Sequence, residues 1–142
     1  MAGNLLVEIV TPESALWSGP ATALIGRSSD GEFTILAQHT PIVGDIVPGV
    51  VRVETAEGVK SFAVHGGFFQ VGPSDDHEST RATVLAGTAE LTSSIDVARA
   101  TAAKEQAEAV LSARAGEEAD EDAQRAARAD LARAELRLSA AS

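Results

Sequence analysis

The sequence contains no cysteine, so disulfide bonds and thiolate metal sites are excluded. Histidine is also scarce, because only His39, His65 and His77 occur among the 142 residues. No two of these histidines are three or four residues apart, the spacing that places a pair of ligands on one side of a helix. The sequence therefore predicts no metal site.

Long hydrophobic runs are missing as well. No apolar segment approaches the roughly 18 to 20 residues that a membrane-spanning helix needs. The first ten residues, MAGNLLVEIV, have no basic region, and Glu8 interrupts their apolar run, which argues against a signal peptide. We therefore expect a soluble, cytoplasmic protein that inserts no segment directly into a membrane.

Basic residues are also few. There are 11 basic and 21 acidic residues, which gives a net charge of −10. Proteins that bind nucleic acids gather Lys and Arg on one face, whereas an acidic chain repels phosphate backbones and anionic lipid surfaces. We expect no nucleic-acid partner. Residues 1–91 carry 4 basic and 11 acidic residues, and residues 92–142 carry 7 and 10.

The composition changes near Leu91. Beyond it there is no proline and one glycine, and 17 of 51 residues are alanine. Gly, Pro, Val, Ile and Thr dominate before it, so the change is from strand-forming to helix-forming residues. We predict two domains, residues 1–91 and 92–142.

The first domain consists of short strand-like segments separated by turn signals. The segments predicted as strands are 5–10, 21–27, 32–36, 50–54, 59–65, 67–71 and 81–86. A turn is expected at Ser18-Gly19-Pro20, and Asp30-Gly31 is a strong hairpin signal. We expect residues 72–80 to form a solvated hairpin tip with His77 at the surface. Strands at this spacing indicate an all-β sandwich or barrel.

The second domain has the pattern of two helices, at about 94–114 and 120–140. Ser93 and Asp96 form an S-x-x-D pattern that predicts the start of the first helix, and Gly116 is its expected C-cap. In the second helix an apolar stripe recurs at Ala123, Ala127, Leu131, Ala134 and Leu138.

Four arginines of the second helix fall away from this stripe and predict a basic opposite face: Arg125, Arg128, Arg133 and Arg137. The alternative is a solvated face whose arginines are balanced by acidic neighbours. Because the stripe is mostly alanine, packing of the hairpin buries little apolar area. Two interpretations stay open: a hairpin that detaches or changes shape, and a static antiparallel hairpin.

Residues 31–53, GEFTILAQHTPIVGDIVPGVVRV, contain a histidine, two prolines and three glycines among apolar residues. Glu32 and His39 are too far apart in sequence to indicate an acid–base pair, and no serine or cysteine nucleophile constellation occurs. A loop of fixed shape on a rigid sheet is typical of a contact surface. The apolar residues are either partner contacts or core, and core is the expectation for Ile46 and Val47.

The order and spacing of four segments resemble the ε subunit of bacterial F-type ATP synthases over nearly the whole chain. In that family Gly-Glu, a strand, His-x-Pro and Pro-Gly recur in the order seen at 31–53. VHGGFFQV at 64–71 is similar to its Gly-Gly-Phe strand, TVLAGTAE at 83–90 to its last strand, and IDVARATAAKEQAE at 95–108 to the start of its first helix. Where the family usually has Pro-Gly before the histidine, this chain has Ala37-Gln38.

The resemblance implies a β-sandwich of about ten strands followed by a C-terminal α-helical hairpin. It further implies a non-catalytic rotor subunit without a required cofactor, bound to γ and the c-subunit ring at the cytoplasmic face of the bacterial membrane. Such a subunit couples rotation of the proton-driven ring to the catalytic head. The implied contact residues for the c-ring and γ are Glu32, His39, Ile42 and Val43.

In the family the helical hairpin can extend along γ toward the catalytic head of α and β subunits. There its basic second helix faces an acidic segment of β and blocks ATP hydrolysis. Arg125, Arg128, Arg133 and Arg137 match that role in kind.

Some members bind regulatory ATP on the compact hairpin through an I/L-D-x-x-R-A motif. Ile95, Asp96 and Arg99 match this motif, and Glu90 stands five residues before it, as in the ATP binders. However, Gln106 replaces the arginine expected further along the first helix, and a neutral amide loses a phosphate contact. The competing interpretation is that Asp96 caps the helix.

Two other classes of protein remain open from the sequence alone. One is a free-standing β-sandwich module with a helical tail, which would bind neither γ nor the c-ring. The other is a small hydrolase that uses His39 or His65 with a carboxylate, and the isolated histidines are the only sequence feature that supports it.

Overall fold

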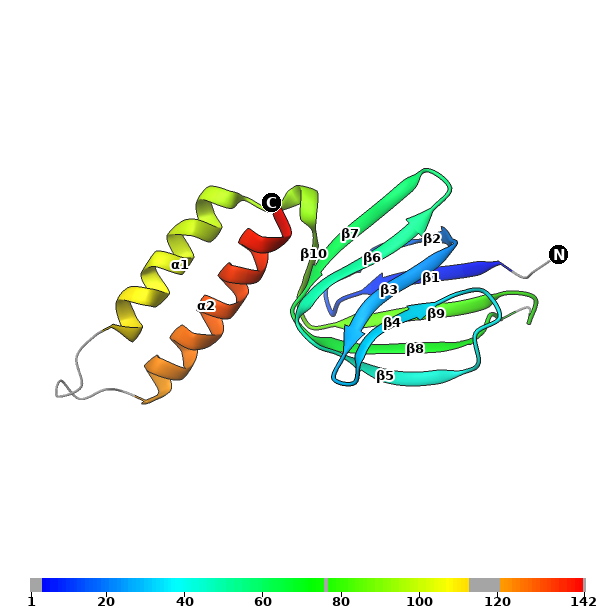
Figure 1. Cartoon of the computed structure of the whole chain (residues 1–142), viewed down its shortest axis with the longest axis horizontal. Helices are drawn as coiled ribbons and strands as arrows, with labels where there is room; N and C mark the ends of the chain where they lie inside the picture. Colours follow the sequence, from blue (N-terminus) through cyan, green and yellow to red (C-terminus); the bar gives the residue numbers. More distant parts are fainter. Residues whose placement is uncertain (1–3, 76, 113–120, 142) are drawn as a thin grey trace. The chain divides into compact units, whose positions relative to one another are not determined.

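The computed structural model describes residues 4–75, 77–112 and 121–141, and in them the chain forms ten β-strands and two α-helices (Figure 1). The chain divides into two compact units, residues 1–91 (the sandwich unit) and 92–142 (the helical unit). The strands are β1 (Leu5–Val10), β2 (Ala15–Ala21), β3 (Ala23–Ser28), β4 (Gly31–Ile35), β5 (Ile42–Ile46), β6 (Gly49–Thr55), β7 (Gly58–Val64), β8 (Gly67–Pro73), β9 (Thr80–Ala86) and β10 (Ala89–Leu91).

The sandwich unit consists of two five-stranded sheets. Sheet A has the strand order β2-β1-β9-β8-β5, and sheet B has the order β10-β7-β6-β3-β4. Strand β1 runs parallel to β9, and every other pairing between the described strands is antiparallel. Two sheets that pack face to face confirm the predicted β-sandwich.

Alternation along the strands explains how the two sheets share a core. In β1, Leu5, Val7 and Ile9 are buried, whereas the residues between them face outward. The same period of two recurs in β6 and β9, since successive side chains of a strand point to opposite faces. Each sheet therefore has one apolar inner face and one outer face available to solvent or a partner.

Two phenylalanines join the sheets in the core. The rings of Phe33 in β4 and Phe69 in β8 are stacked with centroids 4.1 Å apart. Each ring lies over a glycine of a neighbouring strand: a Cβ at Gly26 would come within 2.7 Å of Phe33, and a Cβ at Gly44 within 2.5 Å of Phe69. These glycines leave the space that the stacked rings occupy.

The sequence-based strand list lacks β2, β5 and β10. The turn expected at Ser18-Gly19-Pro20 is wrong, because these residues lie inside β2. Proline cannot donate a ladder hydrogen bond, and β2 tolerates it because this strand is an edge of sheet A. Strand β5 is the opposite edge of sheet A. Its sequence contains Gly44 and Asp45, which are rare in strands, so the sequence did not indicate a strand there.

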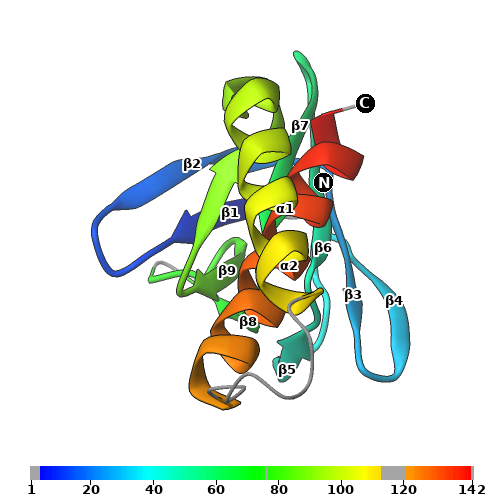
Figure 2. The same cartoon turned by 90° about the vertical axis from the view of Figure 1, so that its left-hand side faces the viewer.

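The helical unit begins with a short 3₁₀ turn, η1 (Thr92–Ser94), and continues with α1 (Val97–Leu111) and α2 (Glu121–Ala141). Figures 1 and 2 show the two helices side by side and antiparallel. Alanines fill their contact, and the buried ones are Ala100, Ala107, Ala127 and Ala134. Of the predicted stripe, Leu131 and Leu138 are half-buried and Ala123 is exposed.

The expected start of the first helix needs correction. The helix begins after Asp96, whose side chain accepts a hydrogen bond from the Arg99 backbone N–H at 3.0 Å, whereas Ser93 belongs to η1. Asp96 is therefore the N-cap, as in the competing interpretation of its role. The helix ends at Leu111, with Ser112 as its C-cap. The C-cap predicted at Gly116 lies outside the described residues.

Candidate interaction surfaces

The stretch 31–53 is built from three strands, β4, β5 and the first part of β6, and not from one long loop. It crosses from sheet B to sheet A between β4 and β5 and returns to sheet B with β6. Its middle strand, β5, therefore lies in a different sheet from β4 and β6, which separates side chains that are close in sequence.

Glu32 and His39 lie at opposite ends of the sandwich unit. Glu32 is exposed in β4, beside the turn that joins β3 to β4, and pairs across the strands with Arg27. His39 lies beyond the other end of β4, where the chain approaches the start of β9: the Gln38 backbone N–H donates to the Thr80 hydroxyl at 2.7 Å. Figure 1 shows the β3–β4 turn and the β4–β5 connection at opposite ends. The structure does not bring the two residues together.

Backbone conformation and local hydrogen bonds fix the connection that carries His39. Gln38 has a φ of 68°, in the left-handed region that few non-glycine residues adopt. Nδ1 of His39 lies 2.7 Å from the carbonyl oxygen of Thr40, and the ring is half-buried. Although Ala37-Gln38 replaces the family's usual Pro-Gly, the connection has a defined shape.

The apolar residues of β5 divide between surface and core. Val43 is 70% exposed and Ile42 is 45% exposed. Ile46 is buried, as expected of a core residue, and Val47 is half-buried. Ile42 and Val43 therefore lie at the surface, close to the end that carries His39, and this end displays most of the predicted contact residues.

A pair of hydrogen bonds ties the other end of the stretch across the two sheets. The Asp45 carboxylate in β5 accepts from both the backbone N–H and the hydroxyl of Ser29, each at 3.0 Å. Ser29 lies in the turn between β3 and β4, so this contact links an edge strand of sheet A to the edge hairpin of sheet B. It holds the turn next to Glu32 in place.

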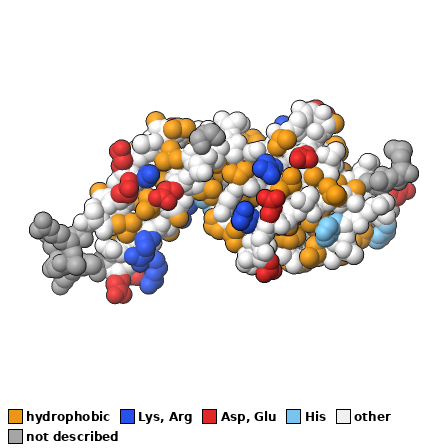
Figure 3. All heavy atoms as spheres, viewed as in Figure 1, with side chains coloured by type: hydrophobic (Ala, Val, Ile, Leu, Met, Phe, Trp, Pro, Cys, Tyr) orange, Lys and Arg blue, Asp and Glu red, His pale blue; other side chains and the backbone are white. Residues whose placement is uncertain are grey.

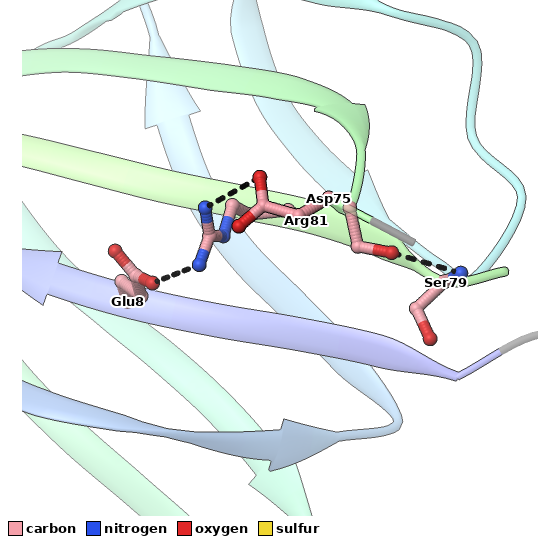
Figure 4. A network of polar contacts seen from close by, with 5 residues as sticks. Glu8, Asp75, Ser79 and Arg81 are labelled. Carbon is pink, nitrogen blue, oxygen red and sulfur yellow. Dashed lines mark hydrogen bonds and ion pairs between the residues drawn. The ribbon is translucent and has the colours of Figure 1, made fainter. Parts of the chain in front are cut away.

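The outer face of sheet A also carries an ion network, which sequence reasoning did not single out. Arg81 of β9 lies 3.0 Å from Glu8 of β1 and 3.8 Å from Asp75 (Figure 4). Next to it, the Ser79 backbone N–H donates to the Ser74 hydroxyl, and Ser74 is buried at the base of the turn between β8 and β9. His77 in this turn is exposed, as predicted.

The four arginines of α2 do not share one face, and the predicted basic face needs correction. Arg133 and Arg137, one helical turn apart, line a groove of about 430 Å³ between α1 and α2. Arg125 and Arg128 are exposed and do not line this groove. Arg125 pairs with Asp122 at 3.8 Å, and Arg133 pairs with Asp130.

The residues predicted to bind a nucleotide divide between the two units. Asp96, which accepts from the Arg99 backbone, belongs to the helical unit with Ile95, which is half-buried. Glu90 belongs to β10 of the sandwich unit, where its carboxylate lies 3.9 Å from Nε2 of His65. Gln106 lines the groove between the helices with Arg133 and Arg137.

Within the described ranges 4–75, 77–112 and 121–141, no helix is long and apolar enough to cross a membrane. The same ranges contain no group of three or more His, Cys, Asp or Glu residues arranged to hold a metal ion.

Comparison with known proteins identifies the family. The family model of the ATP synthase delta/epsilon chain β-sandwich domain matches residues 4–92. The chain belongs to the ATP synthase epsilon chain family. The epsilon chain of Thermobifida fusca is 42% identical over 141 residues, which cover 97% of this chain and 93% of that one. The epsilon chain of Alkalihalophilus pseudofirmus is 39% identical over 108 residues, 76% of this chain and 77% of that one. The resemblance seen in the sequence is confirmed.

Two solved structures share the fold of this epsilon family member. A chain of the Euglena gracilis mitochondrial ATP synthase, in a structure of OSCP, F1 and the c-ring, matches with a TM-score of 0.73 at 22% identity and covers 96% of this chain and 79% of its own. A chain of the Tetrahymena thermophila mitochondrial ATP synthase central stalk and c-ring matches with a TM-score of 0.58 at 12% identity, covering 97% and 96%. At these identities the likeness concerns the fold alone.

Proposed function

We propose that the chain is a non-catalytic rotor subunit of a proton-translocating ATP synthase, which binds the γ subunit and the c-ring and turns with them. The observation that carries this proposal is the 42% identity to an ATP synthase epsilon chain over 97% of the chain, since it spans both units. The structures that share the fold come from ATP synthase assemblies, one of OSCP, F1 and the c-ring and one of the central stalk and c-ring. The chain then lies at the cytoplasmic face of the membrane as a peripheral part of the complex, and catalysis lies in other subunits.

The sandwich unit suits a contact role better than a catalytic one. Glu32 and His39, at opposite ends of the unit, form no acid–base pair, whereas Ile42 and Val43 are exposed apolar residues on a sheet edge. We assign Glu32, His39, Ile42 and Val43 to contacts with γ and the c-ring. Because Glu32 lies apart from the other three, it contacts a different part of the rotor.

Sedimentation of the full chain with the γ subunit of the same organism tests this proposal. We expect a one-to-one complex at micromolar concentrations. If the two proteins sediment separately at tens of micromolar, the chain is a free-standing β-sandwich module and the rotor assignment fails.

We also propose that the helical unit restrains ATP hydrolysis by reaching the α and β subunits of the catalytic head when its helices extend. Alanine-lined contacts bury little apolar surface, so separation of α1 from α2 costs little. Arg125 and Arg128 are exposed, and Arg125 pairs with Asp122, whereas Arg133 and Arg137 line the groove between α1 and α2.

Removal of residues 92–142 is therefore expected to raise the ATPase activity of the assembled complex. Two double variants then show whether the closed or the extended form of the helical hairpin inhibits hydrolysis. If the extended form inhibits, the double substitution R133A/R137A is expected to relieve inhibition. A larger relief than that of R125A/R128A would show that exposure of the groove residues contributes. Unchanged activity after the deletion would show that the hairpin does not inhibit.

The chain requires no cofactor in this proposal, and regulatory ATP has weak support. Asp96 already accepts a hydrogen bond as the N-cap of α1, and the amide of Gln106 supplies no positive charge to a phosphate in the groove. We expect no heat in a calorimetric titration with millimolar ATP. Saturable heat that D96A or R99A abolishes would instead establish a nucleotide site.

A further inference from the structure

Two arginines lie together on the outer face of sheet B. They are Arg27 and Arg52, half of the four basic residues that positions 1–91 contain against 11 acidic ones. Arg52 of β6 lies opposite Ile25 of β3, and Arg27 is the next residue of β3 on the same face, so the two arginines are diagonal neighbours. Long side chains at diagonal positions of a sheet reach one another. Figure 3 shows this face, with basic and acidic side chains next to each other.

Both arginines line one small pocket, here called the arginine pocket. Its volume is about 190 Å³, and its other charged lining residue is Glu32 of β4. Residues 48–50 at the start of β6 complete the wall with the backbone and apolar side chains. Pockets for drug-sized ligands begin at roughly 300 Å³, so this pocket suits a small ion.

The charges of the arginine pocket do not neutralise one another through ion pairs. In the described ranges 4–75, 77–112 and 121–141, Arg27, Arg52 and Glu32 form no ion pair, whereas Arg81 of sheet A is held by Glu8 and also by Asp75. Two guanidinium groups at diagonal positions repel each other, and an anion between them removes that repulsion. The planar fork of N–H donors on each guanidinium matches the oxygens of an oxyanion.

Glu32 restricts which oxyanion fits. An ionised carboxylate accepts hydrogen bonds and donates none, so it repels an oxyanion that has lost all its protons, such as sulfate. Phosphate keeps a P–O–H group at neutral pH, and this group can donate to Glu32 while the other oxygens accept from the arginines. Two arginines beside one carboxylate therefore favour phosphate over sulfate and over a phosphodiester, which also lacks the O–H.

We propose that the arginine pocket binds inorganic phosphate, with Arg27 and Arg52 donating to its oxygens and Glu32 accepting from its O–H group. The site goes beyond the proposed rotor role and does not depend on it. If that role holds, the ligand is also a substrate of ATP synthesis, bound outside the catalytic head. Because Glu32 is also assigned to a rotor contact, phosphate and a partner at Glu32 compete for this side chain.

Titration of the isolated full-length chain with sodium phosphate tests the site, followed by two-dimensional amide NMR spectra at constant ionic strength. We expect saturable shifts of the backbone amides of Gly26, Gly49 and Val50, which line the arginine pocket. Sodium sulfate is expected to bind about tenfold more weakly, because it cannot donate to Glu32. Equal affinity for the two ions would mean an adventitious ion only, and it would overturn the proposal, as would the absence of saturable shifts.

Charge variants show whether the two arginines hold the ion. R27A and R52A are each expected to weaken phosphate binding by about tenfold, because each removes charge-assisted hydrogen bonds. K60A is the matched control, since Lys60 is an exposed basic residue of β7 that does not line the pocket. An equal loss in K60A would show general attraction of anions and no site. Thermal unfolding shows whether each variant is folded.

The substitution E32Q tests the selectivity. It keeps the shape of the side chain and removes its charge, so the preference for phosphate over sulfate is expected to be lost, mainly through a gain in sulfate affinity. An unchanged preference would overturn the role of Glu32 and the assignment to phosphate. Glycerol phosphate has the same terminal group on a larger body, and tighter binding of it than of phosphate would overturn the assignment to the free ion. None of these titrations contains γ, so their failure leaves the rotor role intact.

Discussion

At the scale of single residues, the stacked rings that join the two sheets leave no room for a methyl group at the glycine beneath Phe69. Phe69 is 4% exposed and stacks on Phe33, and its ring lies directly over Gly44. Glycine is needed at position 44 because of this close approach and not because of a turn.

The substitution G44A is expected to destabilise the chain by about 1–3 kcal/mol, because its Cβ would lie 2.5 Å from the Phe69 ring. Chemical denaturation measures the change. G72A is the matched control: Gly72 is in β8, and a Cβ there meets nothing within 4 Å. Equal stability of both variants would show that Phe69 moves aside freely.

The bond between Asp45 and Ser29 is the second residue-scale contact with a measurable effect. D45A removes two hydrogen bonds between the sheets, and we expect a loss of about 1 kcal/mol in the free energy of unfolding. D75A provides the comparison, since Asp75 is 96% exposed and its ion pair with Arg81 is 3.8 Å long. Exposed ion pairs contribute little, so D75A is expected to be near neutral; a larger loss in D75A than in D45A would contradict this account.

At the scale of elements, the start of α1 shows how a cap decides a helix boundary. The S-x-x-D pattern offered two capping residues, and Asp96, three positions later than Ser93, forms the bond to Arg99. Ser93 instead lies in the 3₁₀ turn that precedes the helix.

Loss of the cap gives a prediction for this element. D96A is expected to destabilise the helical unit by about 1 kcal/mol, because the Arg99 backbone N–H loses its acceptor. S93A is expected to leave helicity unchanged. Circular dichroism at 222 nm during thermal unfolding compares the two variants. A greater loss of helicity in S93A than in D96A would show that Ser93 is the N-cap, as the sequence pattern predicted.

At the scale of the whole molecule, the sandwich unit has a complete core of its own. The buried cluster that includes Phe62, Leu24 and Ile35 is composed entirely of residues from the sandwich unit. In the described part of the helical unit, 92–112 and 121–141, the buried residues of the two helices are alanines, so these residues form no comparable core.

Residues 1–91 alone are therefore expected to keep the cooperative thermal transition of the sandwich, whereas residues 92–142 alone are expected to lose much of their helicity. Most of the stability of helices in proteins comes from tertiary packing, and an alanine-lined contact supplies little of it. Calorimetry and circular dichroism of the two fragments measure this. A fragment 1–91 that unfolds without cooperativity would show that the helices are needed for the sandwich.

Some features followed from the sequence because they depend on local pattern. The alternation in Leu5–Val10 and Thr80–Ala86 marks strands wherever they lie in the fold, since a strand needs only its own period of two. The alanine-rich composition beyond Leu91 likewise indicates helices, and the quoted motifs were enough to recognise the family.

Tertiary structure decided which of these residues meet. Phe68 and Phe69 are neighbours in sequence, but Phe68 lies on the outer face of sheet A and Phe69 lies in the core. The pairing of β8 with β9 sets the register that places Phe68 beside Leu85. Glu32 and His39 are separated because β4 lies between them, and Arg133 and Arg137 border a groove because α1 packs beside α2. The sequence by itself determined seven of the ten strands, the two helices and the family. Only long-range pairing, which no local pattern encodes, decided the surfaces through which the chain can bind a partner.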